Sequence, residues 1–411
     1  MIEWSEQHLM IRDMVRKFIE AEIKPNLEEL EHGDLPPYDI LRKMLQTFGI
    51  DEVARQRFAS QIARDKAKAE GKQTATKEKA EGGGSDPGMT LIPIIELCRY
   101  CPGMVTAMGV SVGLTAAAIM SKGTIAQKER WALPLMTMEK IGSWAITEPD
   151  SGSDAFGGMK ATARRDGNGG YLLNGNKTFI TNGPYADTIV FICKLDDGET
   201  TNKRDRKILS FVLDKGMPGL TQSKPLRKMG MHSSPTGELF LEDVRVGTDR
   251  LIGETEDIPA RSGAKDTFSM ERSGVAAMAL GIVEECLALC IDYARTRVAF
   301  GKPIGEFQLI QLKLAQMEVA RMNIQNIVFR TIELAQQGKS LSFAEASACK
   351  LYTAQAAMGV CLEAVQLFGG NGYMAEYRVE QLCRDAKVLQ IYAGTDEIQV
   401  SAIARSLLAT H

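Results

Sequence analysis

The sequence predicts an α+β fold with three parts, in which a helical domain is followed by a domain of antiparallel strands and then by a helical bundle. Length is the first observation, because 411 residues exceed what one hydrophobic core usually holds. The second is a change of hydrophobic period, from helical to alternating near residue 141 and back to helical near residue 266. Helices, strands and helices in succession are typical of α+β proteins.

The first domain, residues 1–140, is predicted to be mainly helical. Apolar residues of the segment 2–50 share one face at helical spacing, and they include Ile11, Val15, Phe18 and Ile19. An apolar helical pattern returns at residues 89–140. Between these two segments, residues 51–88 form an insertion of different composition.

The insertion is predicted to lie at the surface. Residues 51–81 are rich in Ala, Lys, Glu, Gln and Arg and poor in large apolar side chains, which suits a solvated helix or a mobile arm. The stretch GGGSDPG at 82–88 interrupts helical structure. The composition assigns the insertion no function.

The second and third domains are predicted at residues 141–256 and 257–411. In the second, short β-rich runs separated by Gly, Asn and Asp predict an antiparallel sheet; they are GNGGYLLNGNKTFITNG, DTIVFICKL, KILSFVLDKG and GELFLEDVRV. In the third, helical periodicity predicts a bundle with long segments at 268–297, 306–336, 341–368 and 395–409.

The composition is that of an ordinary soluble protein, with 44% apolar and 25% charged residues. The 49 Lys and Arg nearly balance the 52 Asp and Glu, which does not favour a nucleic-acid partner. The N-terminal segment lacks the basic start and apolar centre of a signal peptide, and no stretch approaches the roughly 20 apolar residues of a membrane span. Eight scattered cysteines suit free thiols in a reducing cytosol, so we expect a cytoplasmic protein.

Two short motifs are set aside. Cys98 and Cys101 form a C-x-x-C, but there is no βαβ context for a redox site and no second pair for a zinc site, so buried thiols and no metal are expected. Gly109, Ser111 and Gly113 match the G-x-S-x-G of a serine hydrolase, yet they lie in a helical run without the strand that this motif requires. No G-x-G-x-x-G follows a strand, which argues against a Rossmann nucleotide site.

Two other segments combine aromatic and hydroxyl side chains with turns. SWAITEPDSGSD at 143–154 ends in a Gly, Ser and Asp turn that offers free backbone amides to an anion or a polar ring edge. FITNG at 179–183 has the same character. Taken alone, both segments also suit ordinary junctions between strands and loops.

Seven segments, in this order and spread over nearly the whole chain, resemble those of the acyl-CoA dehydrogenase family; they are AITEPDSGSD, KTFITNG, LEDVRV, RVAFGKPIGEFQLIQ, QLFGGNGY, RDAKVLQIY and AGTDEIQ. The resemblance implies a helical N-terminal domain, a middle β domain and a C-terminal four-helix bundle. It implies non-covalently bound FAD, an acyl-CoA thioester as substrate and desaturation between C2 and C3. It further implies a homo-oligomer, tetramer or dimer, with an electron-transfer flavoprotein as electron acceptor.

The resemblance assigns two sets of cofactor-binding residues. Around the flavin ring and pyrophosphate it implies Trp144, Ile146, Thr147, Gly152, Ser153, Phe179, Thr181, Thr395 and Glu397. The hydroxyl of Thr181 would donate a hydrogen bond near flavin N5, where negative charge develops. For the adenylate half of FAD it implies contacts across a subunit boundary from Arg297, Phe300, Gln308, Gln366 and Gly370.

For the substrate, the resemblance implies contacts from Ser153, Arg272, Tyr392, Ala393 and Gly394. The backbone N–H at position 393 would hydrogen-bond the thioester oxygen and stabilise the enolate. Arg272 would orient the site or neutralise coenzyme A phosphates, and its alternative is a surface ion pair.

The position at which many family members carry the catalytic carboxylate holds an alanine in this chain. Many family members carry glutamate directly after the tyrosine of the IY segment, where this chain has Ala393. A subset that includes isovaleryl-CoA and long-chain acyl-CoA dehydrogenases instead has the glutamate, followed by arginine, at the start of the first long helix of the bundle. Glu271 and Arg272 match that pattern, so Glu271 is predicted to remove the C2 proton, with its pKa raised by a dry pocket.

Three other interpretations are consistent with the sequence. Glu271 taken alone also suits a carboxylate favoured by the positive end of a helix dipole. An oxidase that passes electrons to O2 is the alternative within the family. A non-catalytic acyl-CoA- or FAD-binding protein is the alternative from another class.

Overall fold

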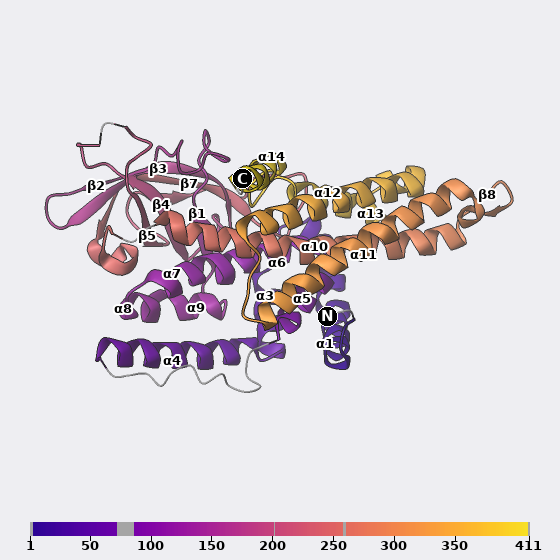
Figure 1. Cartoon of the computed structure of the whole chain (residues 1–411), viewed down its shortest axis with the longest axis horizontal. Coiled ribbons are helices and arrows are strands. Elements are labelled where there is room, and N and C mark those ends of the chain that lie inside the picture. The colour runs from indigo at the N-terminus through magenta and orange to yellow at the C-terminus, as the bar shows by residue number, and fades with distance from the viewer. Residues whose placement is uncertain (1–2, 72–85, 201, 258–259, 410–411) are drawn as a thin grey trace.

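The computed structural model describes residues 3–71, 86–200, 202–257 and 260–409. The chain builds a sheet at one end and a long helical bundle that extends away from it, with α4 alongside (Figure 1). The α+β fold and the order of helices, sheet and helices are as predicted.

The N-terminal helices begin at recognisable capping signals. Ser5 caps α1, because its hydroxyl accepts a hydrogen bond from the backbone of His8 and the His8 side chain pairs with the cap in return. Asp86 caps α5, which has Pro87 at its first position. The helices are α1 (Glu6–Phe18), α2 (Leu27–Glu31), α3 (Tyr38–Thr47), α4 (Ile50–Ala69), α5 (Pro87–Cys98), α6 (Pro102–Met108), α7 (Ala117–Lys122), α8 (Ile125–Gln127) and α9 (Leu133–Met136), with a π-helical segment η3 (Gly109–Ala116) between α6 and α7.

Within the insertion, residues 51–69 belong to helix α4, so the helical alternative is correct there, and Pro87 and Gly88 already begin α5, while residues 72–85 lie outside the described residues. The helix is not wholly solvated, because Phe58 and Ile62 are buried at a spacing of one turn. They join the core beneath the sheet, and the ion pair from Lys128 to Asp65, 2.8 Å long, fixes the same face.

The middle strands form one mixed sheet instead of the predicted antiparallel sheet. β4 is flanked by β5 on one side in antiparallel pairing, but β1 and β2 both run parallel to β4. The loop between β1 and β2 returns the chain to the same edge of β4, and an alternating pattern within a short strand does not specify its partner. The strands are β1 (Gly142–Ala145), β2 (Thr162–Arg165), β3 (Gly170–Thr181), β4 (Thr188–Leu195), β5 (Ile208–Asp214), β6 (Leu220–Gln222) and β7 (Thr236–Gly247).

The C-terminal bundle has α10 at its centre, packed against α5, α11 and α12. Its helices are α10 (Ala260–Thr296), α11 (Gln308–Gln336), α12 (Phe343–Phe368), α13 (Val379–Val388) and α14 (Asp396–Ala409), with a small hairpin of β8 (Val298–Ala299) and β9 (Lys302–Pro303) at the tip. Ser342 starts α12 through a capping box with Glu345.

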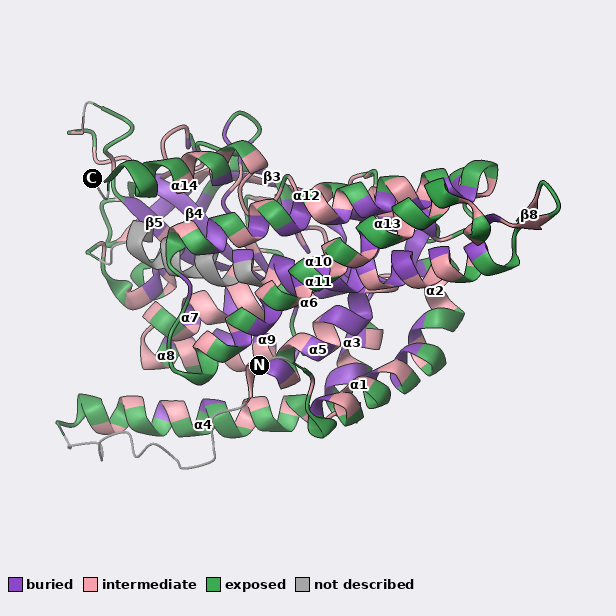
Figure 2. Ribbon diagram, turned by 45° about the vertical axis from the view of Figure 1, so that its right-hand side comes forward, coloured by how far each residue is buried: buried purple, intermediate pink, exposed green. Residues whose placement is uncertain are grey.

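Two hydrophobic cores hold the parts together. The larger core joins α1, α3 and α5 of the N-terminal part to α10, α11, α12 and α13 of the bundle. The second lies between the sheet and α4, α7 and α9. Figure 2 shows the buried residues running through the interior of the bundle, whereas α4 is exposed along most of its outer side.

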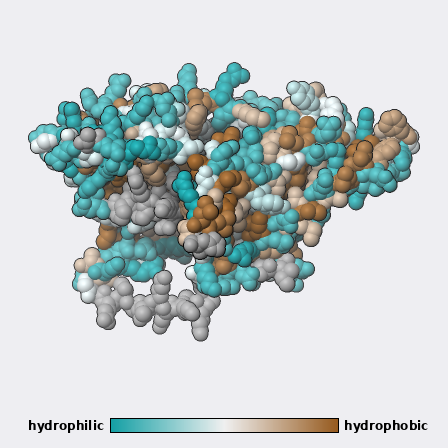
Figure 3. Space-filling model, turned by 45° about the horizontal axis from the view of Figure 1, so that its top comes forward, coloured by the Kyte–Doolittle hydropathy of each residue, from teal (hydrophilic) through white to brown (hydrophobic). Residues whose placement is uncertain are grey.

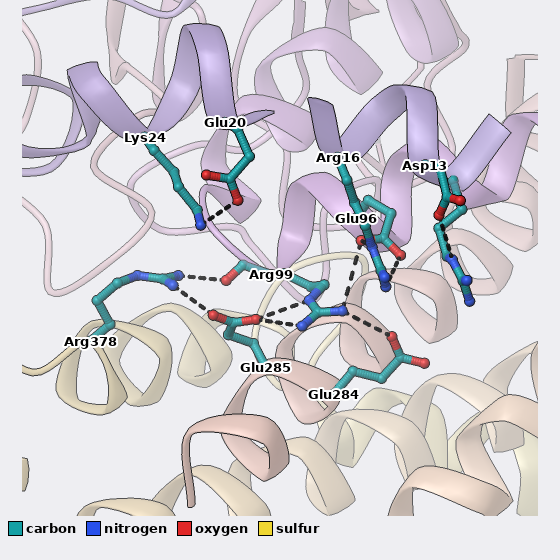
Figure 4. Close-up of polar contacts among 10 residues, drawn as sticks. Asp13, Arg16, Glu20, Lys24, Glu96, Arg99, Glu284, Glu285 and Arg378 are labelled. Carbon is teal, nitrogen blue, oxygen red and sulfur yellow. Dashed lines mark hydrogen bonds and ion pairs between the residues drawn. The ribbon is translucent and has the colours of Figure 1, made fainter. Parts of the chain in front are cut away.

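An ion-pair network closes the junction between the N-terminal helices and the bundle (Figure 4). Arg99, after the end of α5, lies 2.9 Å from Glu285 on α10, and Arg378, before α13, lies 2.8 Å from the same carboxylate. Arg16 on α1 pairs with the buried Glu96 on α5 at 2.8 Å. Removing one partner would leave a largely buried charge without compensation, so the network fixes how these helices meet.

Two described helical segments are long and apolar enough to cross a membrane, contrary to the expectation from sequence. They are Pro102–Lys122 and Gly274–Thr296. The second is the centre of the bundle, with 72% of its most apolar window buried, as in the core helix of a folded domain. Figure 3 shows hydrophobic residues gathered over the helical half of the molecule and hydrophilic residues over the sheet end.

Candidate functional site

The turn between α13 and α14 has an unusual backbone. Ala393 has φ of +53° and Gly394 has φ of +91°, a region that costs an alanine energy and persists only where the surroundings impose it. The side-chain amide of Gln399 donates to the carbonyls of both residues, at 3.0 and 2.7 Å, and Arg272 Nε lies 3.3 Å from the Ala393 carbonyl. None of the described residues accepts a hydrogen bond from the Ala393 N–H, which leaves it available to a ligand.

The last helix is fixed to the bundle at its first residue, Asp396. Its carboxylate accepts hydrogen bonds from Gln355 and Gln390, at 3.2 and 3.1 Å, and pairs with the fully buried Lys350 on α12 at 3.3 Å. Beside it, Thr395 is half-buried in the turn and Glu397 is exposed in the first turn of α14. The anchoring role of Asp396 is not visible in the sequence, because nothing local shows where Lys350 lies.

Glu271 lies on α10 near enough to Tyr392 for its charge to add to burial in raising the pKa of that hydroxyl, but it is not at a helix start. The helix begins at Ala260, eleven residues earlier, so the dipole effect of the first turn does not reach Glu271 and that alternative is wrong. Burial raises the pKa of its carboxyl to about 7, against the opposing charges of Arg272 and Lys350. A carboxylate with a pKa near neutrality has the property that a general base requires.

Arg272 is buried, with 4% of its surface exposed, so a surface ion pair does not describe it. Its guanidinium donates to the Ser347 hydroxyl at 2.9 Å and lies 4.2 Å from the centre of the Phe343 ring. Together with the Ala393 contact, these partners join α10, α12 and the turn through one side chain. Arg272 therefore fixes where the turn lies relative to Glu271.

The segment at 143–154 crosses the edge of the sheet beside β3. Trp144 is half-buried on β1 and Ile146 is buried, while Gly152 and Ser153 are exposed in the turn. The Thr147 carbonyl accepts a hydrogen bond from the backbone of Thr178 at 3.0 Å, which brings the two predicted segments side by side.

The end of β3 presents an aromatic residue to the surface. The pairing of β3 with β7 is interrupted between Lys177 and Ile180, and Phe179 at this bulge has φ of +56° and is 68% exposed. Thr181, the last residue of β3, is half-buried. A bulge re-aims one side chain out of the alternating pattern, which accounts for an exposed aromatic residue in this strand.

A buried ion pair that the sequence analysis missed supports both segments. Lys177 on β3 is fully buried and donates to the Glu148 carboxylate at 2.9 Å and to the Ile146 carbonyl at 3.0 Å. The same carboxylate accepts hydrogen bonds from the backbones of Lys160 and Ala161. In the alternating pattern of β3, Lys177 occupies a position that faces the core. A lysine at such a position is the feature of the sequence that could have indicated a buried ion pair.

Asn182 ties the second segment to the N-terminal helices. Its side-chain amide donates to the carbonyls of Ala107 and Gly142, both at 2.9 Å, and its oxygen accepts from the Tyr38 hydroxyl at 3.0 Å. Asn182 also has a positive φ, of 63°. The FITNG turn is thus fixed to α3, α6 and β1 at once.

The second predicted set of cofactor residues lies far from this region, at the tip of the bundle near β8 (Figure 1). All its members are exposed; they are Arg297, Phe300, Gln308, Gln366 and Gly370. Along α10 the 26 residues from Glu271 to Arg297 span about 39 Å. Phe300 is 96% exposed. The structure therefore brings the segments of Thr147 and Thr181 side by side, places Thr395 and Glu397 at the turn before α14, and separates the second set from the sheet within one chain.

The two motifs set aside have structural explanations. Cys98 and Cys101 are free and buried, as expected. The Ser111 hydroxyl accepts a hydrogen bond from the backbone of Gly142 at 2.9 Å and lies within the π-helical η3, so it does not form a nucleophile elbow. Among the described residues, no group of His, Cys, Asp and Glu is arranged to hold a metal ion.

Comparisons with known proteins cover nearly the whole chain. Family models match residues 5–51 and 49–139 (acyl-CoA dehydrogenase, N-terminal domain), 143–244 (middle domain) and 262–408 (C-terminal domain). A short-chain-specific acyl-CoA dehydrogenase of Megasphaera elsdenii is 40% identical over 335 residues, which are 81% of this chain and 85% of that protein.

Solved structures give the same result. Butyryl-CoA dehydrogenase from Megasphaera elsdenii superposes with a TM-score of 0.83 at 33% identity, covering 99% of this chain and all of that one. An acyl-CoA dehydrogenase complexed with FAD from Bacillus anthracis superposes with a TM-score of 0.81 at 28% identity, covering 99% of this chain and 68% of that one.

Proposed function

Because the chain belongs to the acyl-CoA dehydrogenase family, we propose that it converts an acyl-CoA thioester to the trans-2-enoyl-CoA with Glu271 as the base that removes the C2 proton. The observation that carries the proposal is the half-buried carboxylate of Glu271, which shares its region with the turn at Ala393. Burial raises the pKa of this carboxylate to about 7. Alanine at position 393 cannot exchange protons, so the carboxylate must come from another element. Glu271 is on the helix that Arg272 joins to this turn.

The turn supplies the second catalytic group. A thioester whose C2 proton is removed develops negative charge on its oxygen, and a fixed backbone donor stabilises that charge. The Ala393 N–H suits this role because both neighbouring carbonyls are already held, by Gln399 and Arg272. Arg272 acts here as a positioning residue.

The residues around this region fit the cofactor of the family, FAD. Phe179 is an exposed aromatic side chain at a bulge of β3, Thr181 is half-buried at the end of the same strand, and Trp144 is half-buried on β1. A flat aromatic ring system would cover such apolar surface and bring Thr181 to its polar edge. When bound there, FAD accepts the hydride that leaves C3.

The distant set of residues supports an assembly in which copies complete one another's cofactor sites. Thr181 ends β3 in the sheet and Phe300 lies between β8 and β9, at the tip of the bundle away from the sheet (Figure 1), so one FAD molecule would not contact both within one chain. Exposed apolar residues follow α11 and form a surface that a second copy would cover; they are Leu309, Leu312, Val319 and Met322. A homotetramer is the proposed assembly, and a dimer is the alternative.

An electron-transfer flavoprotein is the proposed electron acceptor, and the cytosol the proposed location. The eight free cysteines suit a reducing compartment. The alternatives are an oxidase that uses O2 and a flavoprotein that binds acyl-CoA without reaction.

Anaerobic titration of the FAD-loaded protein with acyl-CoA thioesters tests the proposal. Loss of the oxidised-flavin absorbance is expected for the wild type and not for Glu271→Gln, while both bind the thioester. Glu284→Gln is the matched control, because Glu284 is another carboxyl on α10 with a pKa raised by burial, thirteen residues away from Glu271.

The other functions predict different results. Fast reoxidation with release of peroxide on admission of air would identify an oxidase. Failure of every acyl-CoA to bleach the flavin would identify a binding protein. Retention of most of the activity by Glu271→Gln would refute Glu271 as the base.

A further inference from the structure

A second cation lies beside the base and the turn. Lys350 on α12 is fully buried, and its Nζ lies 3.3 Å from the carboxylate of Asp396, the first residue of α14. Lysine side chains usually keep the ammonium group in water, so a buried one is costly unless it is paired. Burial lowers the pKa of the Lys350 ammonium, and the Asp396 carboxylate opposes this change. The ion pair therefore keeps a positive charge inside the bundle.

Lys350 belongs to the face of α12 that meets Glu271 and Arg272. The Ser347 hydroxyl accepts the hydrogen bond from Arg272 at 2.9 Å, and Ser347 is fully buried like Lys350. The two residues of α12 are three positions apart, so they lie on the same face, one turn from each other. Burial raises the pKa of Glu271, and the charges of Arg272 and then Lys350 oppose that rise. Contacts and charge thus place Lys350 near the proposed base.

The two cations hold the two ends of the turn. Arg272 on α10 lies 3.3 Å from the Ala393 carbonyl, and Lys350 on α12 pairs with Asp396 three residues later. Ala393 carries the backbone N–H that is proposed to stabilise the enolate. A shift of Lys350 or Asp396 would therefore displace this donor relative to Glu271.

Folding alone does not account for the buried ion pair. Replacing such a pair by apolar side chains of similar size is often neutral or stabilising. Other side chains already anchor Asp396, since Gln355 and Gln390 donate to its second carboxylate oxygen at 3.2 and 3.1 Å. The charge of Lys350 has an effect that these neutral amides do not supply, because it stabilises a nearby anion.

We propose that Lys350 is a positioning residue of the reaction, because its buried ammonium group both holds the Asp396 end of the turn and favours the ionised form of Glu271 at neutral pH. The proposal rests on the proposed function, in which ionised Glu271 removes the C2 proton. Among the described residues, the other charged and titratable groups around Glu271 and Lys350 come from α10, the turn and α14; they are Arg272, Tyr392, Asp396 and Glu397.

The pH dependence of flavin reduction tests the role of the charge. Stopped-flow reduction of the FAD-loaded protein by butanoyl-CoA is measured from pH 5.5 to 9 for the wild type and for Lys350→Gln, which replaces the ammonium group by a neutral amide that can still donate to Asp396. The midpoint of the profile should move up by about half a pH unit or more, because ionised Glu271 loses a nearby cation. Lys350→Arg keeps the charge and should keep the midpoint of the wild type.

Thermal unfolding gives a second measurement that needs no turnover. At pH 8, Glu271→Gln should raise the unfolding midpoint, because it removes a buried carboxyl that is ionised there. The rise should be larger in protein that also carries Lys350→Gln, because burying the Glu271 charge without this cation costs more. A purely structural Lys350 would lower the unfolding midpoint by the same amount with either side chain at position 271.

Two further variants keep the result interpretable. Arg330→Met is the matched control, because it breaks a solvent-exposed ion pair of 3.0 Å between α11 and Glu345 on α12, and it should not move the pH midpoint. Asp396→Asn leaves the Lys350 charge in place but loosens the turn, so kcat should fall about tenfold while the pH midpoint does not rise.

An unchanged pH midpoint in Lys350→Gln, or equal effects of that substitution on unfolding with and without Glu271→Gln, would overturn the proposal. If Lys350→Gln did not fold, a midpoint that rises in Asp396→Asn or moves in Lys350→Arg would overturn it. These outcomes are separate from a failure of the proposed function. In that case flavin bleaching would persist in Glu271→Gln, whereas the unfolding measurements would still test whether the two charges interact.

Discussion

Replacing Glu271 by glutamine should inactivate the protein and stabilise it, with both effects depending on pH. The two side chains have nearly the same shape, so the change removes a titrating carboxyl without opening a cavity. In the folded protein, burial raises the pKa of this carboxyl to about 7 from an ordinary value of 4.5. The difference in pKa sets the size of both effects.

The catalytic effect follows the ionised fraction of Glu271. A base with a pKa of about 7 is almost fully ionised at pH 8 and about 3% ionised at pH 5.5, so the rate of flavin reduction should fall about 30-fold between these values. The glutamine variant should lose about two to four orders of magnitude at pH 8, as for a lost general base. Its residual rate should not follow this titration.

The substitution should lower activity but raise the free energy of unfolding. Because the folded pKa is above the unfolded one, the protonated carboxyl contributes stability that is present below about pH 4.5 and is lost as pH rises through about 7. The difference amounts to at most about 3 kcal/mol at pH 8. Glutamine carries no such loss, so the variant should be more stable than the wild type at pH 8 and equal to it near pH 4.5.

Thermal unfolding of the two FAD-loaded proteins at pH 5 and pH 8 measures the difference. For a chain of this length, about 3 kcal/mol corresponds to a rise in the unfolding midpoint of about 3–4 °C. Stopped-flow reduction of the flavin over the same pH range gives the catalytic titration. A midpoint difference that is the same at both pH values, or a wild-type rate that is flat from pH 5.5 to 8, would refute the assignment of a desolvated Glu271 as base.

Three other substitutions test the supporting contacts. Arg272→Lys lacks the planar guanidinium that holds the Ala393 carbonyl, so kcat should fall about tenfold or more with little change in thioester affinity. Weaker binding of the thioester at unchanged kcat would instead indicate that Arg272 contacts the ligand. Lys177→Met should lower stability by about 3–5 kcal/mol in thermal unfolding, because Glu148 is left buried and unpaired. Adding Glu148→Gln should restore part of the lost stability, and no recovery would mean that the broken ion pair does not cause the loss. Asn182→Ala removes three hydrogen bonds that fix the FITNG turn and should cost about 2–4 kcal/mol, whereas a loss below about 1 kcal/mol would contradict the role given to it.

Much of the fold could be predicted from local patterns. Helical and alternating periods gave the order of helices, sheet and bundle, because each period reflects which side chains face a core. The pairing of the strands could not be predicted: β1 and β2 both run parallel to β4, because the loop between β1 and β2 returns the chain to the same edge of β4. The start of α10 was placed too late, since residues 260–267 continue the helix without a clear apolar stripe.

In the candidate site, too, some features could be predicted from the sequence and others could not. The motifs located the turn at Ala393 and the glutamate at position 271 from the sequence alone, and the assignment of Glu271 as base stays a prediction. Only the tertiary structure decided that Arg272 is buried against the turn, that Glu148 and Lys177 pair beneath the two loop segments, and that the second set of predicted cofactor residues lies at the far end of the bundle. The reason is physical: a period is read along the chain, whereas the environment of a charge is set by segments that are distant in sequence and meet only when the chain folds.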